Sequence, residues 1–349
     1  MGPDLRPVGP GLLPVVPFRW RDGERLLVFG RGTAANVGEL LEPGYVVLTT
    51  PRASADAPPD LLGGATAVHE VGAGRVDELA GELRKRVGGS MLVALGGGRV
   101  IDVAKAVAAA DPPRKVTAIP TTLSGAEMTA VHRRAVGAPP GAAGVRPAIV
   151  VNDPALSASQ PLEQLAQSAG NALGHAFEGP VTPLTNPVSA LAALAASQLI
   201  AASFGAATPG ATTLADEARD RLALGALLAG YAISATGYGL HHVMSQTLAR
   251  FAGVGHGAAN TIMLPHTARA LAERAPDWNA RLERAIGSDP AALATAVRDI
   301  SGLTRLRDAG VSEEQLDLCV EEAARRPELA MTPPAAELDE LRALYRAAY

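Results

Sequence analysis

The chain has few aromatic residues, a single cysteine and little net charge, and each shortage excludes a class of function. Phe, Trp and Tyr make up 3% of the 349 residues, too few for a nucleic-acid binder that stacks bases on aromatic side chains. The net charge of −4 gives no basic field that would attract DNA or an anionic membrane. With Cys319 as the single cysteine, an internal disulfide, a thiolate metal cluster and a CxxC redox pair are excluded. Any metal site must therefore use His, Asp, Glu or Asn.

The sequence also shows no targeting signal and no long uninterrupted apolar run. The N-terminal apolar patch is broken by prolines and has no basic start. The alanine-rich stretch 190–204 reads as too short or too interrupted to span a bilayer. Hydrophobic residues make up 48% of the chain, which predicts a folded protein of about two domains. We therefore expect a cytoplasmic protein that binds a small molecule and neither nucleic acid nor a membrane.

The first part of the chain alternates short apolar runs with helical stretches. Alternation of this kind predicts a parallel, doubly wound sheet with right-handed crossovers. Residues 76–87 show helical periodicity, and a second helix is expected over 101–110. The expected strands are 25–30, 45–49, 91–95, 115–119 and 148–151. This part predicts an α/β, Rossmann-like N-terminal domain over residues 1–153.

Beyond Asp153 the strand-like runs stop and long Ala/Leu-rich helices follow. Helices are expected over 160–178, 187–204, 214–237 and 241–250, and the closing region is also helical. The pattern predicts an all-α C-terminal domain over residues 154–349. An α/β half followed by an all-α half would place a ligand-binding cleft between the two domains.

The strongest phosphate-binding signal is the segment Leu95-Gly96-Gly97-Gly98. An apolar strand ends in three glycines and a helix begins at once, so free backbone N–H groups lie where an anion would bind. Lys105, one turn after Asp102, would stay near the same ligand. The spacing is not GxGxxG, so the ordinary dinucleotide fingerprint does not apply. A tight strand-to-helix turn that needs small residues is the alternative interpretation.

A second loop, Ile119-Pro120-Thr121-Thr122-Leu123-Ser124-Gly125-Ala126-Glu127, also follows an expected strand. Its hydroxyl groups and glycine would suit a ribose or a nicotinamide. The alternative is a hydroxyl-capped turn that leads into a helix, which is a common arrangement.

Five of the seven histidines fall in the helical half, in paired or glycine-rich contexts. Asn171 and His175 are four residues apart in NALGHAFE and so share one helix face, with Glu178 three residues further on. His241 and His242 form a pair, and His256 stands between two glycines. A single histidine is more often structural than functional, but several among small residues favour a polar active site.

In combination, these segments resemble the iron-containing alcohol dehydrogenase superfamily, and within it the maleylacetate reductase branch. The resemblance extends from about Leu27 to His266. The segments, in family order, are GGGRVIDVAK, IPTTLSGAEMT, VNDPALSASQP, NALGHAFEG, GLHH and GHGAANTIMLPH. A shortened PTT-to-Glu segment, the pair GLHH and the amide of Asn171 favour the reductase branch.

The resemblance implies the dehydroquinate synthase-like fold of that superfamily, a homodimer and NADH or NADPH as cofactor. After the second expected strand, Thr50-Pro51-Arg52 offers no acidic residue to select against a 2′-phosphate, so we expect NADPH to be tolerated with Arg52 as a contact. The cofactor-binding residues that follow are Thr50, Arg52, Gly96, Gly97, Gly98, Asp102, Lys105, Thr121 and Thr122.

The four ligands of the metal-dependent relatives match Asn171, His175, His242 and His256. A neutral amide replaces the acidic ligand, and loss of that negative charge disfavours a bound catalytic Fe or Zn ion, although a three-histidine site remains physically feasible. Without metal, His175, His241, His242 and His256 would donate hydrogen bonds to the oxygen of an enone acid such as maleylacetate while hydride reduces its double bond to give 3-oxoadipate.

Three departures from the family pattern keep other functions open. Gln246 replaces a histidine usually found near the nicotinamide, Ala126 replaces a serine before Glu127, and Arg99 replaces a serine after the glycines. An amide cannot act as a general acid near pH 7. The alternatives are a metal-dependent alcohol dehydrogenase, a divergent biosynthetic or lyase-type member, and a cofactor-binding protein without catalysis.

Overall fold

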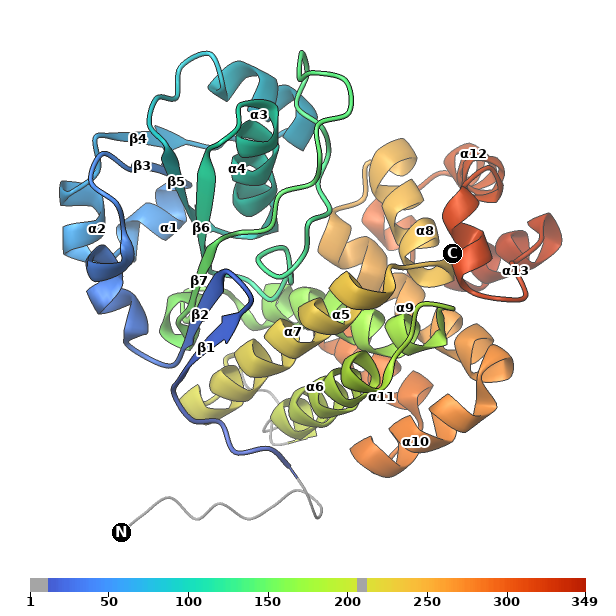
Figure 1. The fold of residues 1–349 in the computed structure, drawn as a ribbon. Coiled ribbons are helices and arrows are strands. Elements are labelled where there is room, and N and C mark those ends of the chain that lie inside the picture. The colour runs from blue at the N-terminus through green and yellow to red at the C-terminus, as the bar shows by residue number, and fades with distance from the viewer. Residues whose placement is uncertain (1–11, 206–211) are drawn as a thin grey trace, which may run out of the picture. The chain divides into compact units, whose positions relative to one another are not determined.

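The computed structural model describes residues 12–205 and 212–349, and Figure 1 shows the course of the chain. The first residues of the N-terminal apolar patch lie outside the described residues. The chain divides into two compact units, one formed by Val15–Gln160 and one in which Pro161–Tyr349 provide nearly all the residues. The sequence placed the boundary after Asp153, and the division in the structure follows Gln160 instead.

The first unit contains a seven-stranded sheet with the strand order β1-β2-β7-β6-β5-β3-β4. All neighbouring strands are parallel except β1, which pairs antiparallel with β2. The strands are β1 Phe18–Asp22, β2 Arg25–Phe29, β3 Val46–Thr49, β4 Ala67–Glu70, β5 Met91–Gly96, β6 Lys115–Pro120 and β7 Ile149–Asn152. The prediction of a wholly parallel sheet is therefore wrong at one edge.

The antiparallel edge comes from a hairpin with a two-residue loop at Gly23 and Glu24. Gly23 has a φ of 61°, in the left-handed region that glycine adopts without strain. The dipeptide Asp22-Gly23 is a strong hairpin signal, but the flanking Phe18–Asp22 is rich in charge and mostly exposed, so it lacks the apolar run of a central strand. Strand β4 was missed for the same reason, since its side chains alternate between half-buried and exposed.

Both faces of the sheet are apolar because it is covered on both sides, as a doubly wound sheet requires. In β3, Val46 and Leu48 pack into a cluster with α3 (Val76–Leu83) and α4 (Gly98–Ala110). Val47, between them, points to the opposite cluster, which contains Val37 of the 3-10 segment Thr33–Leu40 and Leu61 of α2 (Pro59–Gly63). The short α1 (Pro51–Ala55) follows β3 directly.

Among its described residues the second unit consists of helices and connecting loops without a strand, as the sequence predicts. Its cluster of buried residues brings α8 and α9 together with the C-terminal helices, including the wholly buried Tyr345. The helices are α5 Leu162–Glu178, α6 Pro187–Gly205, α7 Asp216–Thr236, α8 Leu240–Thr247, α9 His256–Arg274, α10 Pro276–Ile286, α11 Pro290–Ile300, α12 Glu313–Ala324 and α13 Leu338–Ala348.

Helix α6 corrects the interpretation of residues 190–204. It has 19 residues and a mean hydropathy of 1.6 over its most apolar window, so its length and composition alone would allow it to cross a membrane. Helix α7 together with Leu240–Ala252 passes the same test as a pair, but with a bend of 104° between the two parts. Within the unit, 56% of the α6 window is buried, as in the core helix of a folded domain.

Candidate active site

The three predicted cofactor segments meet at one edge of the sheet in the α/β unit. Strand β5 lies between β3 and β6, and all three run in the same direction. The segments after them, beginning at Thr50, Gly97 and Thr121, therefore emerge side by side at the carboxyl ends of the strands, where open α/β sheets bind their ligands. The backbone N–H of Thr121 donates to the carbonyl of Gly96 at 3.0 Å, which joins two of these segments directly.

The glycine triplet is packed against the second loop, and this explains why larger residues do not fit. A Cβ atom on Gly97 would lie 3.1 Å from the Thr122 hydroxyl oxygen, and one on Gly98 would lie 2.9 Å from Cβ of Ser124. Helix α4 begins at Gly98 without a side-chain cap on its first N–H groups. The tight-turn interpretation therefore applies; the turn also leaves backbone donors at a helix N-terminus, where an anion is favoured, and phosphate binding there stays a prediction.

Lys105 is engaged by the protein itself. Its side chain is fully buried, and its ammonium group donates to Asp102 at 2.8 Å and to the carbonyls of Ala126 and Val131 at 3.0 and 2.8 Å. Thr50 also has a structural contact, since its hydroxyl accepts from the N–H of Ala53 and caps α1. The cofactor role of both residues remains a prediction. Arg52 is exposed on α1, and its contact with a 2′-phosphate also remains a prediction.

Sequence reasoning missed the buried charges that hold this loop. Arg25, at the start of β2, donates to the carbonyls of Glu127 and Pro147, both at 3.2 Å. The Glu127 side chain is 1% exposed, and burial raises its pKa to about 7 despite the opposing charges of Lys105 and Arg25. The sequence carried no signal for Arg25, because a charged residue at the start of an apolar strand is usually exposed.

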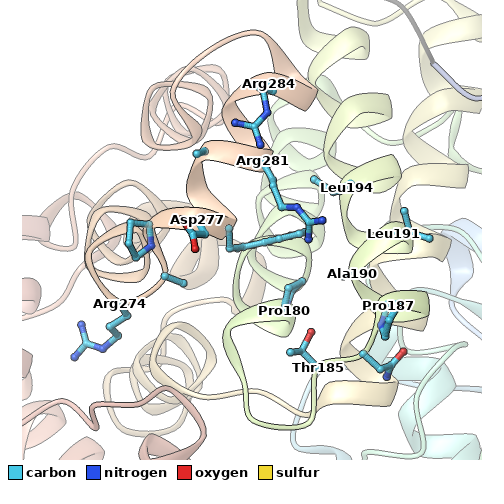
Figure 2. A pocket seen from close by; sticks show the side chains of 15 residues that line it. Pro180, Thr185, Pro187, Ala190, Leu191, Leu194, Arg274, Asp277, Arg281 and Arg284 are labelled. Carbon is cyan, nitrogen blue, oxygen red and sulfur yellow. The ribbon is translucent and has the colours of Figure 1, made fainter.

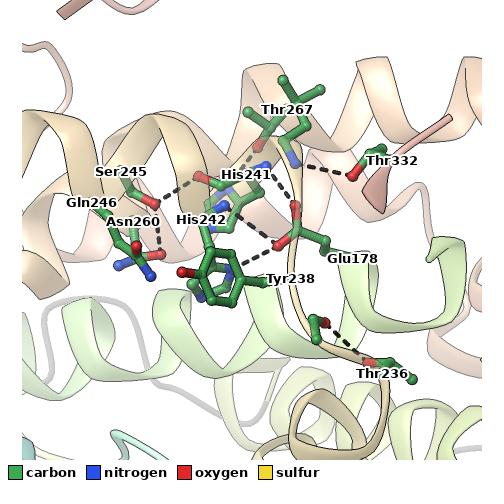
Figure 3. Close-up of polar contacts among 12 residues, drawn as sticks. Glu178, Thr236, Tyr238, His241, His242, Ser245, Gln246, Asn260, Thr267 and Thr332 are labelled. Atoms are coloured by element: carbon green, nitrogen blue, oxygen red, sulfur yellow. Dashed lines mark hydrogen bonds and ion pairs between the residues drawn. The ribbon is translucent and has the colours of Figure 1, made fainter. Parts of the chain in front are cut away.

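Histidines of α5 and α8 lie together in the helical unit, and Figure 3 shows His241 and His242 beside Glu178. The rings of His175 and His242 are stacked with their centroids 4.6 Å apart, and the ring of His241 stands edge-on to His242 at 4.9 Å. Gly174 permits this approach, since a Cβ atom there would lie 2.4 Å from Nε2 of His241. Burial lowers the pKa of both His175 and His242, and His256, the exposed first residue of α9, adds to the shift by charge repulsion.

Glu178, at the end of α5, fixes the orientation of His242. One carboxylate oxygen accepts from the backbone N–H of His241 at 2.6 Å, and the other accepts from Nδ1 of His242 at 2.8 Å. Burial lowers the pKa of His242 to about 3, so the imidazole is neutral at pH 7. The proton on Nδ1 therefore points to Glu178 and leaves Nε2 with a bare lone pair.

This orientation corrects the expectation that all four histidines donate hydrogen bonds to a substrate oxygen. Neutral His242 presents an acceptor nitrogen. His241 is 0% exposed, and its Nδ1 lies 2.8 Å from the Thr267 hydroxyl, which itself lies within hydrogen-bond distance of main-chain carbonyls of α9. Its Nε2 is buried and lies against Gly174. His175 keeps Nδ1 without a hydrogen-bond partner among the described residues, so it remains the available donor.

The buried nitrogens fit the chemistry of a divalent metal site. Nε2 of His242 and Nδ1 of His175 are buried with no hydrogen-bond partner among the described residues. A histidine whose other nitrogen donates to a carboxylate is the usual form of a metal-bound imidazole. No three His, Cys, Asp or Glu side chains in residues 12–205 and 212–349 are grouped closely enough to hold an ion as they stand. The histidines therefore offer suitable donor atoms, but these atoms are not arranged around one point in this structure.

A pocket lies elsewhere on the helical unit, between α6 and α10 (Figure 2). Its volume is about 1090 Å³, and Leu191, Leu194, Arg281 and Arg284 are among the residues that line it. None of the predicted site residues lines it.

Comparison with known proteins gives a consistent result. The chain is 33% identical to maleylacetate reductase from Burkholderia cepacia over 341 residues, which cover 93% of this chain and 95% of that protein. The solved maleylacetate reductase from Agrobacterium tumefaciens superposes with a TM-score of 0.78 at 26% identity, covering 95% of this chain and 97% of the other. A putative alcohol dehydrogenase from Ralstonia eutropha superposes with a TM-score of 0.81 at 31% identity, with 95% and 97% covered.

Residues 165–349 match the C-terminal domain of the Fe-containing alcohol dehydrogenase family. The predicted fold and the resemblance to maleylacetate reductases are thereby confirmed. The family name includes iron, so the expectation that Asn171 disfavours a metal finds no support in the comparisons. The chain belongs to the Fe-containing alcohol dehydrogenase family and is an oxidoreductase.

Proposed function

We propose that the protein is an NAD(P)H-dependent reductase of an enone acid, with maleylacetate as substrate and 3-oxoadipate as product. The observation that carries the proposal is the pairing of stacked His175 and His242 with Glu178, in a chain that resembles maleylacetate reductases along most of its length. A cytoplasmic homodimer is part of the proposal and rests on the family resemblance.

The cofactor would bind at the carboxyl ends of β3, β5 and β6. The N–H groups at the start of α4 would receive the pyrophosphate, and Asp102, Thr121 and Thr122 would surround the remainder. Bound NAD(P)H supplies the hydride that reduces the double bond of the substrate. Arg52, exposed after β3, would contact a 2′-phosphate and allow NADPH as well as NADH.

The histidines would stabilise the negative charge that develops on the substrate and supply the proton that completes the reduction. Hydride addition moves negative charge to the ketone oxygen, and a hydrogen bond from His175 would stabilise that oxygen in a site from which water is largely excluded. His256 is exposed at the first residue of α9, so we assign to it the delivery of a proton to the carbon next to the ketone. Glu178 keeps His242 in one tautomer, which fixes the face that His242 presents to the substrate.

A second candidate, a metal-dependent alcohol dehydrogenase, is favoured by the bare Nε2 of His242 behind its carboxylate partner. His175, His242 and His256, with the amide oxygen of Asn171, would hold the ion. When bound, iron or zinc would act as a Lewis acid that polarises a carbonyl or hydroxyl oxygen. In that case Asn171 would bind more weakly than an aspartate, because it brings no negative charge.

The experiment is oxidation of NADH and NADPH by added maleylacetate, followed at the nicotinamide absorbance band. We expect turnover with both cofactors, and turnover that survives EDTA would favour the metal-free form. No oxidation of either cofactor, in protein shown to bind them by titration, would refute the proposal. Elemental analysis together with EDTA-sensitive oxidation of an alcohol would instead identify the second candidate.

A further inference from the structure

A network of four polar side chains lies beside His242 and contains none of the predicted site residues. The ring centroid of Tyr238 is 5.9 Å from that of His242. The guanidinium of Arg326 donates from Nη2 to the hydroxyl of Tyr238 and to the amide oxygen of Gln246, both at 3.2 Å. Its Nε and Nη2 also donate to the two carboxylate oxygens of Glu328 at 3.0 Å each.

The network fixes the direction in which the Gln246 amide points. Gln246 lies four residues after His242 on α8, so the two side chains share one helix face. Figure 3 shows the side chains of Gln246 and His242 on the same side of their helix. Because Arg326 engages the amide oxygen, the NH₂ end of Gln246 is its donor end; one N–H can be donated to the Tyr238 hydroxyl, and the second is left for another partner. This end donates hydrogen bonds and cannot lose a proton near pH 7.

One edge of the Arg326 guanidinium group is available to a ligand. Its Nη1 makes no hydrogen bond or ion pair to the residues that the structure describes, and its side chain is 23% exposed. Glu328 holds the opposite edge, so the guanidinium is already ordered before a ligand arrives. A preordered donor loses little conformational entropy on binding. Arg326 and Gln246 thus offer donors in one place, and donors of this kind bind an anionic oxygen group.

We propose that Arg326 and Gln246 form a carboxylate-binding subsite beside His242, which selects an acceptor that carries a carboxylate over a neutral one. The inference rests on the proposed function, since it assigns the acid group of that substrate. Glu328 neutralises part of the charge of Arg326. The subsite therefore orients the acceptor and discriminates between charged and neutral acceptors more than it increases binding affinity. The hydrogen bond from Arg326 to Gln246 also explains why an amide occupies position 246. A histidine there, once protonated, would face the positive charge of Arg326.

The test measures binding of adipate by calorimetry to the intact protein with NADP⁺ present. Adipate is a six-carbon dicarboxylate without a double bond, so it reports binding without reduction. Because the substitution removes a hydrogen bond to a charged group, we expect Arg326→Met to weaken adipate binding about 10-fold or more. Arg326→Lys retains a charge and should recover part of the affinity. The neighbouring Arg325, 67% exposed and paired with Glu322, gives the matched control Arg325→Met, which should bind as the parent does.

Glu328→Gln separates recognition from a merely structural role. If Arg326 only stabilises the structure of the network, Arg326→Met and Glu328→Gln should weaken adipate binding equally. This result would overturn the proposed subsite. We expect Glu328→Gln to bind adipate at least as well as the parent, because it removes a competing carboxylate. In kinetics, Arg326→Met should raise KM for maleylacetate and leave KM for a neutral enone unchanged. Equal increases for both acceptors would contradict the proposal.

The two proposals fail in different ways. Adipate binding that depends on Arg326, in a protein that does not reduce maleylacetate, would leave the subsite standing and remove the proposed reaction. Maleylacetate reduction with adipate binding that is absent, or unchanged by Arg326→Met, would remove the subsite and leave the reaction.

Discussion

The two units build their sites from different parts of the chain. In the α/β unit the candidate site is mostly main chain, with glycines where a Cβ atom would collide with Thr122 or Ser124. Its buried charges, Lys105 and Arg25, are used to hold a loop. In the helical unit the candidate site consists of side chains, and buried imidazole nitrogens have no protein partner among the described residues.

This difference indicates what each unit is for. A surface of backbone N–H groups recognises a phosphate without providing acid or base. Unpaired buried nitrogens are costly for folding, so they point to a ligand, a metal or a reacting group. We therefore assign cofactor binding to the first unit and the chemistry of the acceptor to the second, and the following variants test that assignment from the largest expected effect to the smallest.

His242→Ala should cause the largest loss, with kcat lower by about 10²–10³-fold. The side chain is 4% exposed and lies between His175 and Glu178, so its removal disturbs both the donor and the carboxylate. Steady-state oxidation of NAD(P)H is the measurement, and His266→Ala, on the neighbouring helix α9, is the control. An unchanged rate would remove His242 from the mechanism.

Glu127→Gln should stabilise the protein more at pH 8 than at pH 5. Burial raises the pKa of Glu127 from 4.5 to about 7, so the folded state binds its proton more tightly than the unfolded state does. The Glu127 carboxyl therefore costs stability progressively as the pH rises from about 4.5 to 7, up to about 3 kcal/mol.

The measurement for Glu127 is urea denaturation of the parent and the variant at both pH values. Buried histidines with lowered pKa titrate in the same range with the opposite sign, so the difference between the two proteins is compared at each pH. A difference in unfolding free energy that does not change with pH would show that Glu127 is not buried in the ionised form.

Gly98→Ala should weaken cofactor binding about 10-fold with a smaller effect on kcat. The added Cβ atom would push against Ser124, and overpacking of this kind costs about 1–3 kcal/mol. Cofactor titration by nicotinamide fluorescence measures it, with Gly63→Ala, whose new methyl group would meet no atom within 4 Å, as the matched control. If kcat falls and cofactor affinity does not, the assignment of the two units fails.

Arg52→Ala should have the smallest effect, a loss of NADPH affinity of up to about fivefold with NADH affinity unchanged. An exposed ion pair contributes less than about 1 kcal/mol. The ratio of the two dissociation constants is the quantity to measure, and the exposed Arg75 gives a control in the same unit. Dissociation constants for NADH and NADPH that are alike and unaffected by the substitution would exclude the contact.

Much of the fold was predictable because its signals are local. The fully apolar run Met91–Leu95 and the glycines after it predict a buried strand and a turn whatever the rest of the chain does. The hairpin edge and β4 were missed because exposed strands lack that apolar run. At the site, the histidines were found from spacing, but Glu178 was noticed without a role, and Thr267 and Arg326 gave no sequence signal.

The sequence by itself determined the two-part architecture, the glycine turn after β5 and the histidines available for chemistry. These depend on residue type and spacing along one helix or strand, and neighbouring residues fix them. Which imidazole nitrogen carries a proton, and which cation holds Gln246, was decided by the tertiary structure alone. The partners lie about 60 to 80 residues apart in the chain, at Glu178 with His242 and at Gln246 with Arg326. A hydrogen bond acts only over about 3 Å, so only the packed fold selects its two ends.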